Sequence, residues 1–309
     1  MGDVWSREQA RRSRRLHRRE SIEGLLLYAP ALLVIGFVVL FPMGFAVTLS
    51  TQSWHLTRMA QRGFVGLRNF QTILSDPDWW ASLRRGLVFT FGSLIPMIVL
   101  GLAVAQLLND KNVWAKTLWR SLAVLPWLVP VVTVAIIFRW MFNDVYGILN
   151  FMLVRIGLLD APVAWLSDGA LAMFVLILAN VWRALPLMVV MALAGLQGIP
   201  DEYYQSAEVD GATGWQVYWH ITLPLLMPVI MIVAILRFVW IFNFFDLPWV
   251  MTMGGPAGAT RTPPVYAYLR AFSGHRLGQG AAITLLLFVI LAAFATVYFI
   301  AQKRYTTEQ

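Results

Sequence analysis

Three arginines interrupt long apolar stretches of the sequence, where a charged side chain is unusual. Arg139 stands near the end of one stretch, whereas Arg183 and Arg237 stand near the middle of two others. An arginine at the centre of a bilayer costs about 2.5–3.5 kcal/mol on insertion scales, so such residues mark functional sites by default. A guanidinium donates several N–H groups in a planar fork and can bind a carbonyl, a carboxylate or a solute. Arg139 is close enough to a helix end for its head group to reach the membrane surface.

Aromatic and polar residues accompany Arg237 at helical spacing. Arg237, Ile241 and Phe244 are spaced i, i+4 and i+7, which places them on one face of a helix. Trp240 and Asn243 flank that face. An arginine fork beside a Trp ring suits a polyhydroxylated ring. Two interpretations stay open: the side chains contact a solute, or the rings pack on other helices and Arg237 pairs with a carbonyl or carboxylate.

The sequence carries no pattern of a catalytic or metal site. It contains no cysteine, which excludes disulfides, thiolate nucleophiles and cysteine-bound metals. Neither G-x-x-x-x-G-K-[ST] nor H-E-x-x-H occurs, and its histidines are far apart in polar segments. A membrane-embedded hydrolase is disfavoured because no nucleophile–base or paired-aspartate arrangement is present. We therefore expect no catalytic residue, no metal and no cofactor in this chain.

The apolar residues around these arginines are gathered in six runs. Of the 309 residues, 59% are hydrophobic and 13% are charged, whereas soluble domains are roughly half apolar and a quarter charged. A helix needs about 20 apolar residues to cross a bilayer, and an isolated strand cannot satisfy its backbone there. The predicted fold class is all-α, a polytopic membrane protein with six transmembrane helices. The runs lie at 24–49, 87–108, 122–142, 170–193, 225–250 and 281–301.

Basic residues predict the orientation of these spans. The net charge is +8, and seven arginines stand within the first twenty residues, as is typical of a cytoplasmic anchor. An RNA-binding arm is disfavoured because no basic patch interleaved with aromatics follows. The first run is too long for a signal peptide, so a retained span is predicted. We expect a cytoplasmic basic tail (1–23), a six-span domain (24–301) and a second cytoplasmic tail (302–309).

One loop on the cytoplasmic side departs from the basic pattern. Residues 195–222 contain no Lys or Arg but hold four of the sixteen acids of the chain. Pro200 favours the start of a helix, and Asp201 and Glu202 suit the positive end of its dipole. A short helix is therefore predicted up to about Val209.

An elbow and a second helix are predicted next. Asp210 and Gly211 indicate a turn, since glycine adopts positive φ readily. A second short helix is expected over Gly214–His220 before the next span. Ser206 and Ala207 give the first helix a small-residue patch that another backbone could approach. Such a loop indicates a docking surface outside the membrane.

The spacing within this loop resembles the EAA motif of ABC importer permeases, E-A-A-x3-G-x9-I-x-L-P. Here Gln205-Ser206-Ala207 is followed at the same spacing by Gly211, Ile221 and Leu223-Pro224. Farther on, Met251-Thr-Met-Gly-Gly-Pro256 resembles the L-T-x-G-G-P region of the carbohydrate branch, which includes maltose and glycerol-phosphate permeases. The chain is thus similar to the permease subunits of that branch.

The resemblance implies that this helix docks in a cleft of an ATPase subunit. The motif begins with Gln205 where the family has Glu, and a carboxylate there would make bonds roughly twice as strong as those of an amide. Either Gln205 bonds as a neutral group, or Glu202 or Glu208 supplies the charge. The residues implied in ATPase coupling are Tyr204, Gln205, Ser206, Ala207, Glu208, Asp210 and Gly211.

The resemblance also implies a solute site in the fourth and fifth spans. Matching positions line the sugar site of maltose-type permeases: Arg183, Ala184, Leu187, Arg237, Trp240, Ile241, Asn243 and Phe244. The expected function is the permease subunit of an ATP-driven, binding-protein-dependent importer for an oligosaccharide, polyol or sugar derivative, working by alternating access. A stand-alone secondary transporter or channel is the alternative, which the absence of intramembrane acids for ion coupling disfavours.

Such a machine needs other subunits. The implied partners are a second permease subunit in a heterodimer, two ATPase subunits that bind ATP and Mg²⁺, and an extracytoplasmic solute-binding protein. Membrane lipid is expected around the chain, and nucleic acid is not expected as a partner. The implied location is the inner membrane, with both termini in the cytoplasm. The charge of the solute stays open, because two arginines suit an acidic or a neutral sugar.

Overall fold

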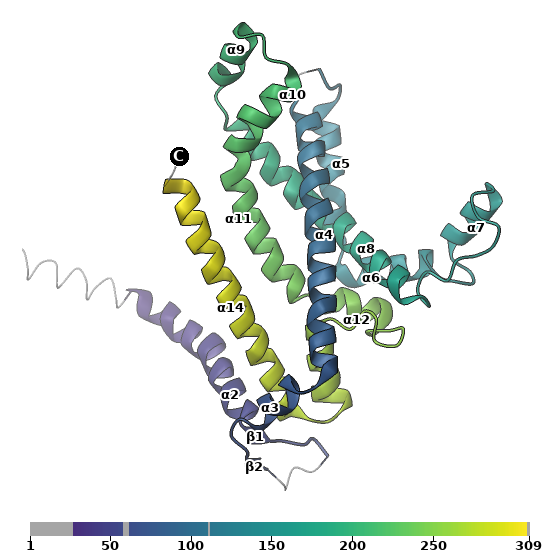
Figure 1. Cartoon of the computed structure of the whole chain (residues 1–309), viewed down its shortest axis with the longest axis vertical. Coiled ribbons are helices and arrows are strands. Elements are labelled where there is room, and N and C mark those ends of the chain that lie inside the picture. Colours follow the sequence, from purple (N-terminus) through teal and green to yellow (C-terminus); the bar gives the residue numbers. More distant parts are fainter. Residues whose placement is uncertain (1–26, 58–61, 111, 308–309) are drawn as a thin grey trace, which may run out of the picture.

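The computed structural model describes residues 27–57, 62–110 and 112–307, which form a long helical bundle (Figure 1). Within these residues, five helices are long and apolar enough to cross a membrane, and a bent pair of helices makes up to six. The predicted all-α class is confirmed, and the tail predicted at 1–23 lies outside the described residues. The five helices are Leu27–Ser50, Pro77–Asn109, Gly169–Gln197, Gly214–Phe242 and Leu277–Ile300.

The second span begins earlier than predicted. The elements up to it are η1 (Gly36–Leu40), α2 (Phe41–Ser50), β1 (Gln52–Ser53), β2 (Gly63–Phe64), α3 (Arg68–Leu74) and α4 (Pro77–Asn109). Asp76 is the N-cap of α4 and accepts a hydrogen bond from the N–H of Asp78 at 2.9 Å, while Pro77 occupies the first turn. The prediction placed the start at residue 87 because charged residues interrupt the apolar run before it. The first turns of α4 therefore extend the helix beyond its apolar part.

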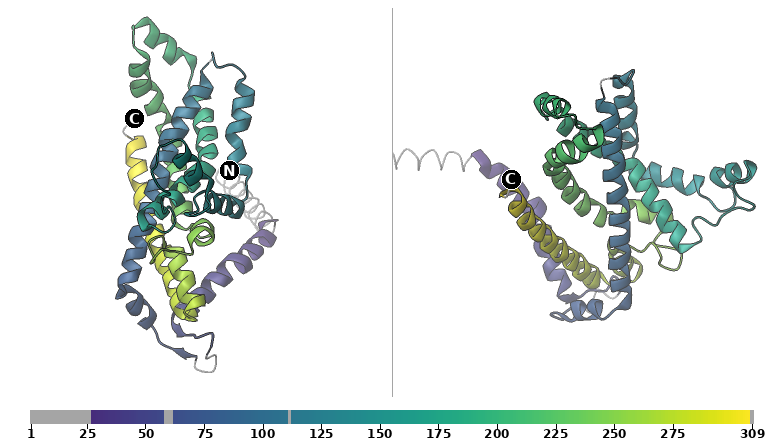
Figure 2. Two further views of the ribbon diagram at one scale, coloured as in Figure 1. Left: turned by 90° about the vertical axis from the view of Figure 1, so that its right-hand side faces the viewer. Right: turned by 45° about the horizontal axis from the view of Figure 1, so that its top comes forward.

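The third predicted span is two helices rather than one. α5 (Lys116–Leu128) and α6 (Val131–Met141) are bent by 91° relative to each other. Pro130 lacks an N–H and excludes the helical conformation at Val129, whose ψ is 126°. After this break, α7 (Ile148–Arg155) projects sideways from the bundle (Figures 1 and 2), and α8 (Gly169–Gln197) returns through it.

The fifth span is displaced from the predicted 225–250. Three consecutive elements form one helix over Gly214–Phe242, so the span starts and ends earlier than the apolar run suggests. The chain leaves the helix at Asn243 and turns into another short helix at Asp246. The elements of this half are α9 (Asp201–Val209), α10 (Gly214–Val217), η3 (Tyr218–Thr222), α11 (Leu223–Phe242), α12 (Asp246–Thr252), α13 (Pro263–Tyr268), η4 (Leu269–Ser273) and α14 (Leu277–Thr307).

The core lies where α8 packs against α4 and α11. Phe89, Met97 and Leu176 are fully buried there. Gly101 of α4 allows a close approach, since a Cβ at this position would lie 2.4 Å from Cγ of Met188 on α8. Small residues let membrane helices approach in this way. This packing fixes the positions of α8 and α11, which carry the two mid-span arginines.

Candidate functional site

The elbow comprises α9, α10 and the four residues that join them, 210–213, and it lies at one end of the bundle (Figure 1). α9 ends in a Schellman motif, in which Gly211 has a φ of +71°. The N–H of Ala212 donates to the carbonyl of Ala207 at 2.9 Å, and the N–H of Gly211 donates to that of Glu208 at 3.1 Å. The predicted helix end and the predicted glycine turn are both confirmed.

A capping box starts the second helix of the elbow. The N–H of Thr213 donates to the side chain of Gln216 at 2.8 Å, and the hydroxyl of Thr213 accepts from the N–H of Gln216 at 3.4 Å. The sequence analysis missed these two residues, although T-x-x-Q before an apolar run is the signature of this cap. The predicted second helix does not stop at His220 but continues into the span.

The predicted coupling residues divide into an inner and an outer set. Tyr204 is half-buried and its hydroxyl lies 3.3 Å from that of Thr222, which ties α9 to the base of the fifth span. Ala207 is only 7% exposed, so it packs within the elbow and does not form an open patch with Ser206 as expected. The exposed members are Gln205, Ser206, Glu208, Asp210 and Gly211. Their role towards an ATPase stays a prediction.

The two mid-span arginines approach each other from α8 and α11. Arg237 is buried, and its guanidinium donates to the carbonyl of Ala184 at 3.4 Å. The guanidinium carbon of Arg183 lies 5.3 Å from the ring centre of Phe244, within the range of a cation–π contact. The guanidinium of Arg237 thus reaches the backbone of the residue next to Arg183. The structure thus brings together residues of two spans that the sequence separates.

The remaining residues of the predicted solute site divide between the core and the exposed surface. Ile241 is buried in the core and Leu187 is half-buried. Trp240, 70% exposed, and Asn243, also exposed, point away from that core. Phe244 follows the end of α11, so it reaches Arg183 from a loop and not from the predicted helix face. Binding of a solute by these residues stays a prediction.

Comparison with known proteins assigns the chain to a family. The model of a family described as the binding-protein-dependent transport system inner membrane component matches residues 97–307. The chain belongs to this family. It is therefore an inner-membrane component of a binding-protein-dependent transport system, as predicted.

Relatives named as ABC transporter or sugar transport permeases match this chain over nearly its whole length. It is 36% identical to the trehalose/maltose transport system permease protein MalF of Thermococcus litoralis, over 92% of this chain and 95% of that protein. It is 35% identical to the inner membrane ABC transporter permease protein YcjO of Escherichia coli, over 87% and 90%. It is 31% identical to the sulfoquinovosyl glycerol transport system permease protein SmoG of Agrobacterium fabrum, over 89% and 88%.

A solved structure with the same fold is a chain of a bacterial ABC transporter that imports the acidic polysaccharide alginate. The TM-score is 0.77 at 23% identity, covering 93% of the permease and 99% of that chain. A second structure of a bacterial alginate ABC transporter, in complex with a periplasmic protein that holds an alginate pentasaccharide, has the same TM-score at 22% identity, with coverage of 94% and 96%. These matches support the permease fold.

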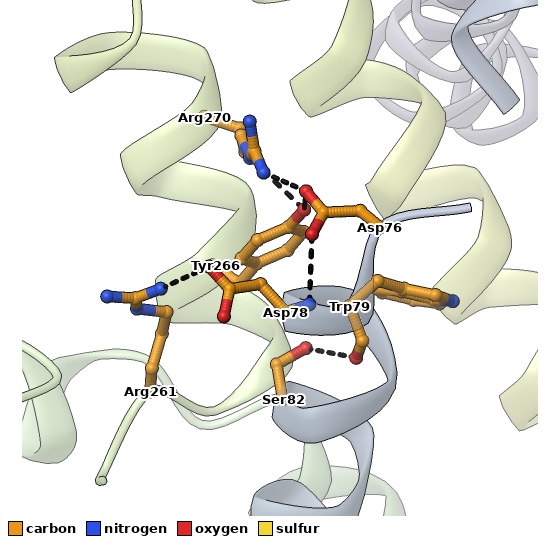
Figure 3. Close-up of polar contacts among 7 residues, drawn as sticks. All are labelled: Asp76, Asp78, Trp79, Ser82, Arg261, Tyr266 and Arg270. Carbon is orange, nitrogen blue, oxygen red and sulfur yellow. Dashed lines mark hydrogen bonds and ion pairs between the residues drawn. The ribbon is translucent and has the colours of Figure 1, made fainter. Parts of the chain in front are cut away.

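At the end of the permease opposite the elbow (Figure 1), two ion pairs and a hydrogen bond tie the start of α4 to η4, to α13 and to the loop before α13 (Figure 3). Asp76, the N-cap of α4, pairs with Arg270 and accepts a hydrogen bond from the hydroxyl of Tyr266 at 2.8 Å. Asp78 pairs with Arg261 at 3.0 Å. Burial, followed by the charge of Asp78, raises the pKa of Tyr266 to about 12, so this hydroxyl keeps its proton.

Tyr266 follows the Gly-Gly-Pro segment, and its partner was not predicted from the sequence. Its carboxylate partner lies 190 positions earlier in the chain, and no local pattern reveals so distant a pair. The Gly-Gly-Pro segment itself forms a tight loop, in which the buried hydroxyl of Thr260 donates to the carbonyl of Gly255 at 2.6 Å. These residues shape the end of the bundle.

Proposed function

We propose that this permease imports a sugar-like solute and that ATP hydrolysis by partner subunits drives the transport. Membership in its family supports the role of membrane component in a binding-protein-dependent transport system. Relatives named for trehalose and maltose and for sulfoquinovosyl glycerol support a sugar or a sugar derivative. The observation that carries the proposal is the preformed elbow of α9 and α10, which extends from one end of the bundle (Figure 1).

The elbow suits a docking surface for an ATPase subunit. The Schellman motif and the capping box fix both helices in advance, so docking requires little further ordering of the chain. Its outer surface offers the amide of Gln205 beside several carboxylates. The exposed Glu202 and Glu208 then supply the charge-assisted bonds that a neutral residue at position 205 cannot make.

The fifth span connects this surface to the arginine pair. One helix runs over Gly214–Phe242, with the elbow at its start and Arg237 near its end. At 1.5 Å per residue, Arg237 lies about 35 Å from Gly214 along the axis. Closure of two ATPase subunits would tilt this helix and change the side from which the solute site is reached.

The proposal also assigns sides and partners. The elbow and both termini face the cytoplasm, and the solute-binding protein docks at the opposite end, near α3 and the paired strands. A second permease subunit, expected to differ from this one, completes the pathway. ATP and Mg²⁺ bind to the ATPase subunits.

Reconstitution in proteoliposomes tests this function. The permease would be purified with the second permease, the ATPase and the binding protein encoded beside it, and uptake of labelled maltose, trehalose and uronic-acid disaccharides would be measured. Uptake of at least one sugar that depends on both ATP and the binding protein is expected. Uptake by the permease alone would identify a stand-alone transporter. If the complete system transports none of these sugars, the sugar assignment is contradicted.

A further inference from the structure

The surroundings of the arginine pair contain N–H donors without matching acceptors. The Nε atoms of Arg183 and Arg237 and the amide nitrogen of Asn180 are buried and have no hydrogen-bond acceptor among the described residues. Asn180 and Arg183 are three residues apart on α8 and therefore lie on one face of it. Three donors thus lie near the crossing of α8 and α11.

Charge in this region is also unbalanced. Neither arginine has a carboxylate within salt-bridge distance in the part of the chain that the structure describes. Asp246, at the start of α12, is exposed and forms no salt bridge with Arg183 or Arg237 among the described residues. Among the described residues, the charges of Arg183 and Arg237 are therefore not neutralised by a salt bridge.

The chemistry of the donors favours one type of ligand group. A sugar hydroxyl accepts hydrogen bonds but also carries a proton that needs an acceptor of its own. An ionised carboxylate, sulfonate or phosphate only accepts, and an arginine fork binds such a group through two parallel bonds. An anion satisfies the donors and the charge together, whereas a neutral sugar satisfies only the donors.

We propose that the solute of this permease is an acidic sugar, whose anionic group binds between Arg237 and Arg183. The inference rests on the proposed function and narrows its substrate class. Asn180 donates a further hydrogen bond to the same group, and the ring of Phe244 lies against the guanidinium of Arg183. Arg237 supplies the uncompensated charge that selects acidic over neutral solutes.

Direct binding to the assembled membrane complex tests this inference independently of the binding protein. The probes are matched mono-, di- and trisaccharides that end either in glucuronic acid or in glucose, and their affinities are measured by equilibrium dialysis. The wild-type complex is expected to bind the best acidic probe at least about tenfold more tightly than its neutral match, the effect of one hydrogen bond to a charged group. Equal or tighter binding of the neutral probe would overturn the inference while leaving sugar transport intact. Binding of neither series would contradict both proposals.

Variants of the arginines test which residue causes the preference for acidic over neutral probes. Arg237→Gln should remove it, and Arg237→Lys should keep most of it, since Lys retains the charge but not the planar fork. Arg139→Gln is the control, because Arg139 is exposed in the last turn of α6 and donates to the carbonyl of Val250 instead of contacting either arginine's helix, so it should change neither affinity. If Arg237→Gln does not assemble, Arg183→Gln tests the same site from α8. A preference that survives in the assembled Gln variant would show that the charge of the pair does not select the solute.

Discussion

At the scale of single residues, Gly211 and Gly214 offer a matched comparison. A Cβ would meet no atom within 4 Å at either position, but only Gly211 has positive φ, at +71°. Gly211→Val should therefore strain the elbow and reduce ATPase stimulation by the solute-loaded binding protein at least about tenfold, because β-branched residues resist this backbone region. Gly214→Val should retain most of the stimulation, since its backbone is not in that region.

The measurement uses the complete transporter in proteoliposomes, with insertion checked by the amount of assembled complex. Stimulation of the Gly211→Val complex at the wild-type level would show that the elbow tolerates distortion and is not the coupling element. Equal loss in both variants would point to crowding at a partner surface instead of backbone strain.

Residue types with a fixed backbone preference could be predicted well. The positive φ of Gly211 and the helix start after Pro200 follow from the side chains themselves, and both are found. The burial of Ala207 could not be predicted, because it depends on how the helix after the elbow folds back. The contact of Arg183 with Phe244 also depends on tertiary structure, since a loop carries the ring to the arginine.

At the scale of elements, the two ion pairs at the start of α4 should differ in strength. Asp76 caps the helix and has two side-chain partners, whereas Asp78 pairs with one arginine and is 52% exposed. Asp76→Ala should destabilise the permease by about 2–4 kcal/mol, from the lost cap and the lost charged hydrogen bonds. Asp78→Ala should cost less than about 1 kcal/mol, as exposed ion pairs do.

Thermal unfolding in detergent, monitored by Trp fluorescence, gives the melting temperature of each variant, and these temperatures are compared. A melting temperature of Asp76→Ala that matches the wild type would mean that the tie between α4, α13 and η4 adds nothing to stability. A larger loss in Asp78→Ala than in Asp76→Ala would reverse the assigned order of the two pairs.

Helix ends were harder to predict than helix existence. Hydropathy finds the apolar centre of each span but misses the charged first turns of α4. Pro130 is visible in the sequence, yet whether a proline bends a helix gently or breaks it by 91° depends on what packs around it. Pro96, Pro186 and Pro228, by comparison, lie inside continuous helices.

At the scale of the whole molecule, the orientation in the membrane can be tested cleanly because the chain contains no cysteine. Ser206 on α9 and Phe64 on β2 are both exposed and lie at opposite ends of the bundle (Figure 1). In intact cells, an impermeant thiol reagent should label Phe64→Cys within minutes, and Ser206→Cys only after lysis. Labelling of Ser206→Cys from outside would invert the proposed topology.

The sequence predicted the order of the spans and five of them as single helices, but not the break in the third or how the spans lie side by side. The pairing of Asp76 with Arg270 and the crossing of α8 with α11 join residues far apart in the chain. A single sequence holds no local pattern for such contacts, because they arise only when the helices pack. The solute site shows this most directly, since Arg183 and Arg237 were each noticed alone and their proximity emerges from the fold.

A tilt of the helix over Gly214–Phe242 as one body would make it a lever between the elbow and Arg237. With Arg237 about 35 Å from the elbow, a rotation of about 10° at the elbow end would carry the arginine sideways by about 6 Å. That stroke is comparable to the length of an arginine side chain. A small angular change imposed on α9 and α10 would thus withdraw the guanidinium from a bound group. Release of the solute would then follow from the geometry of the tilt.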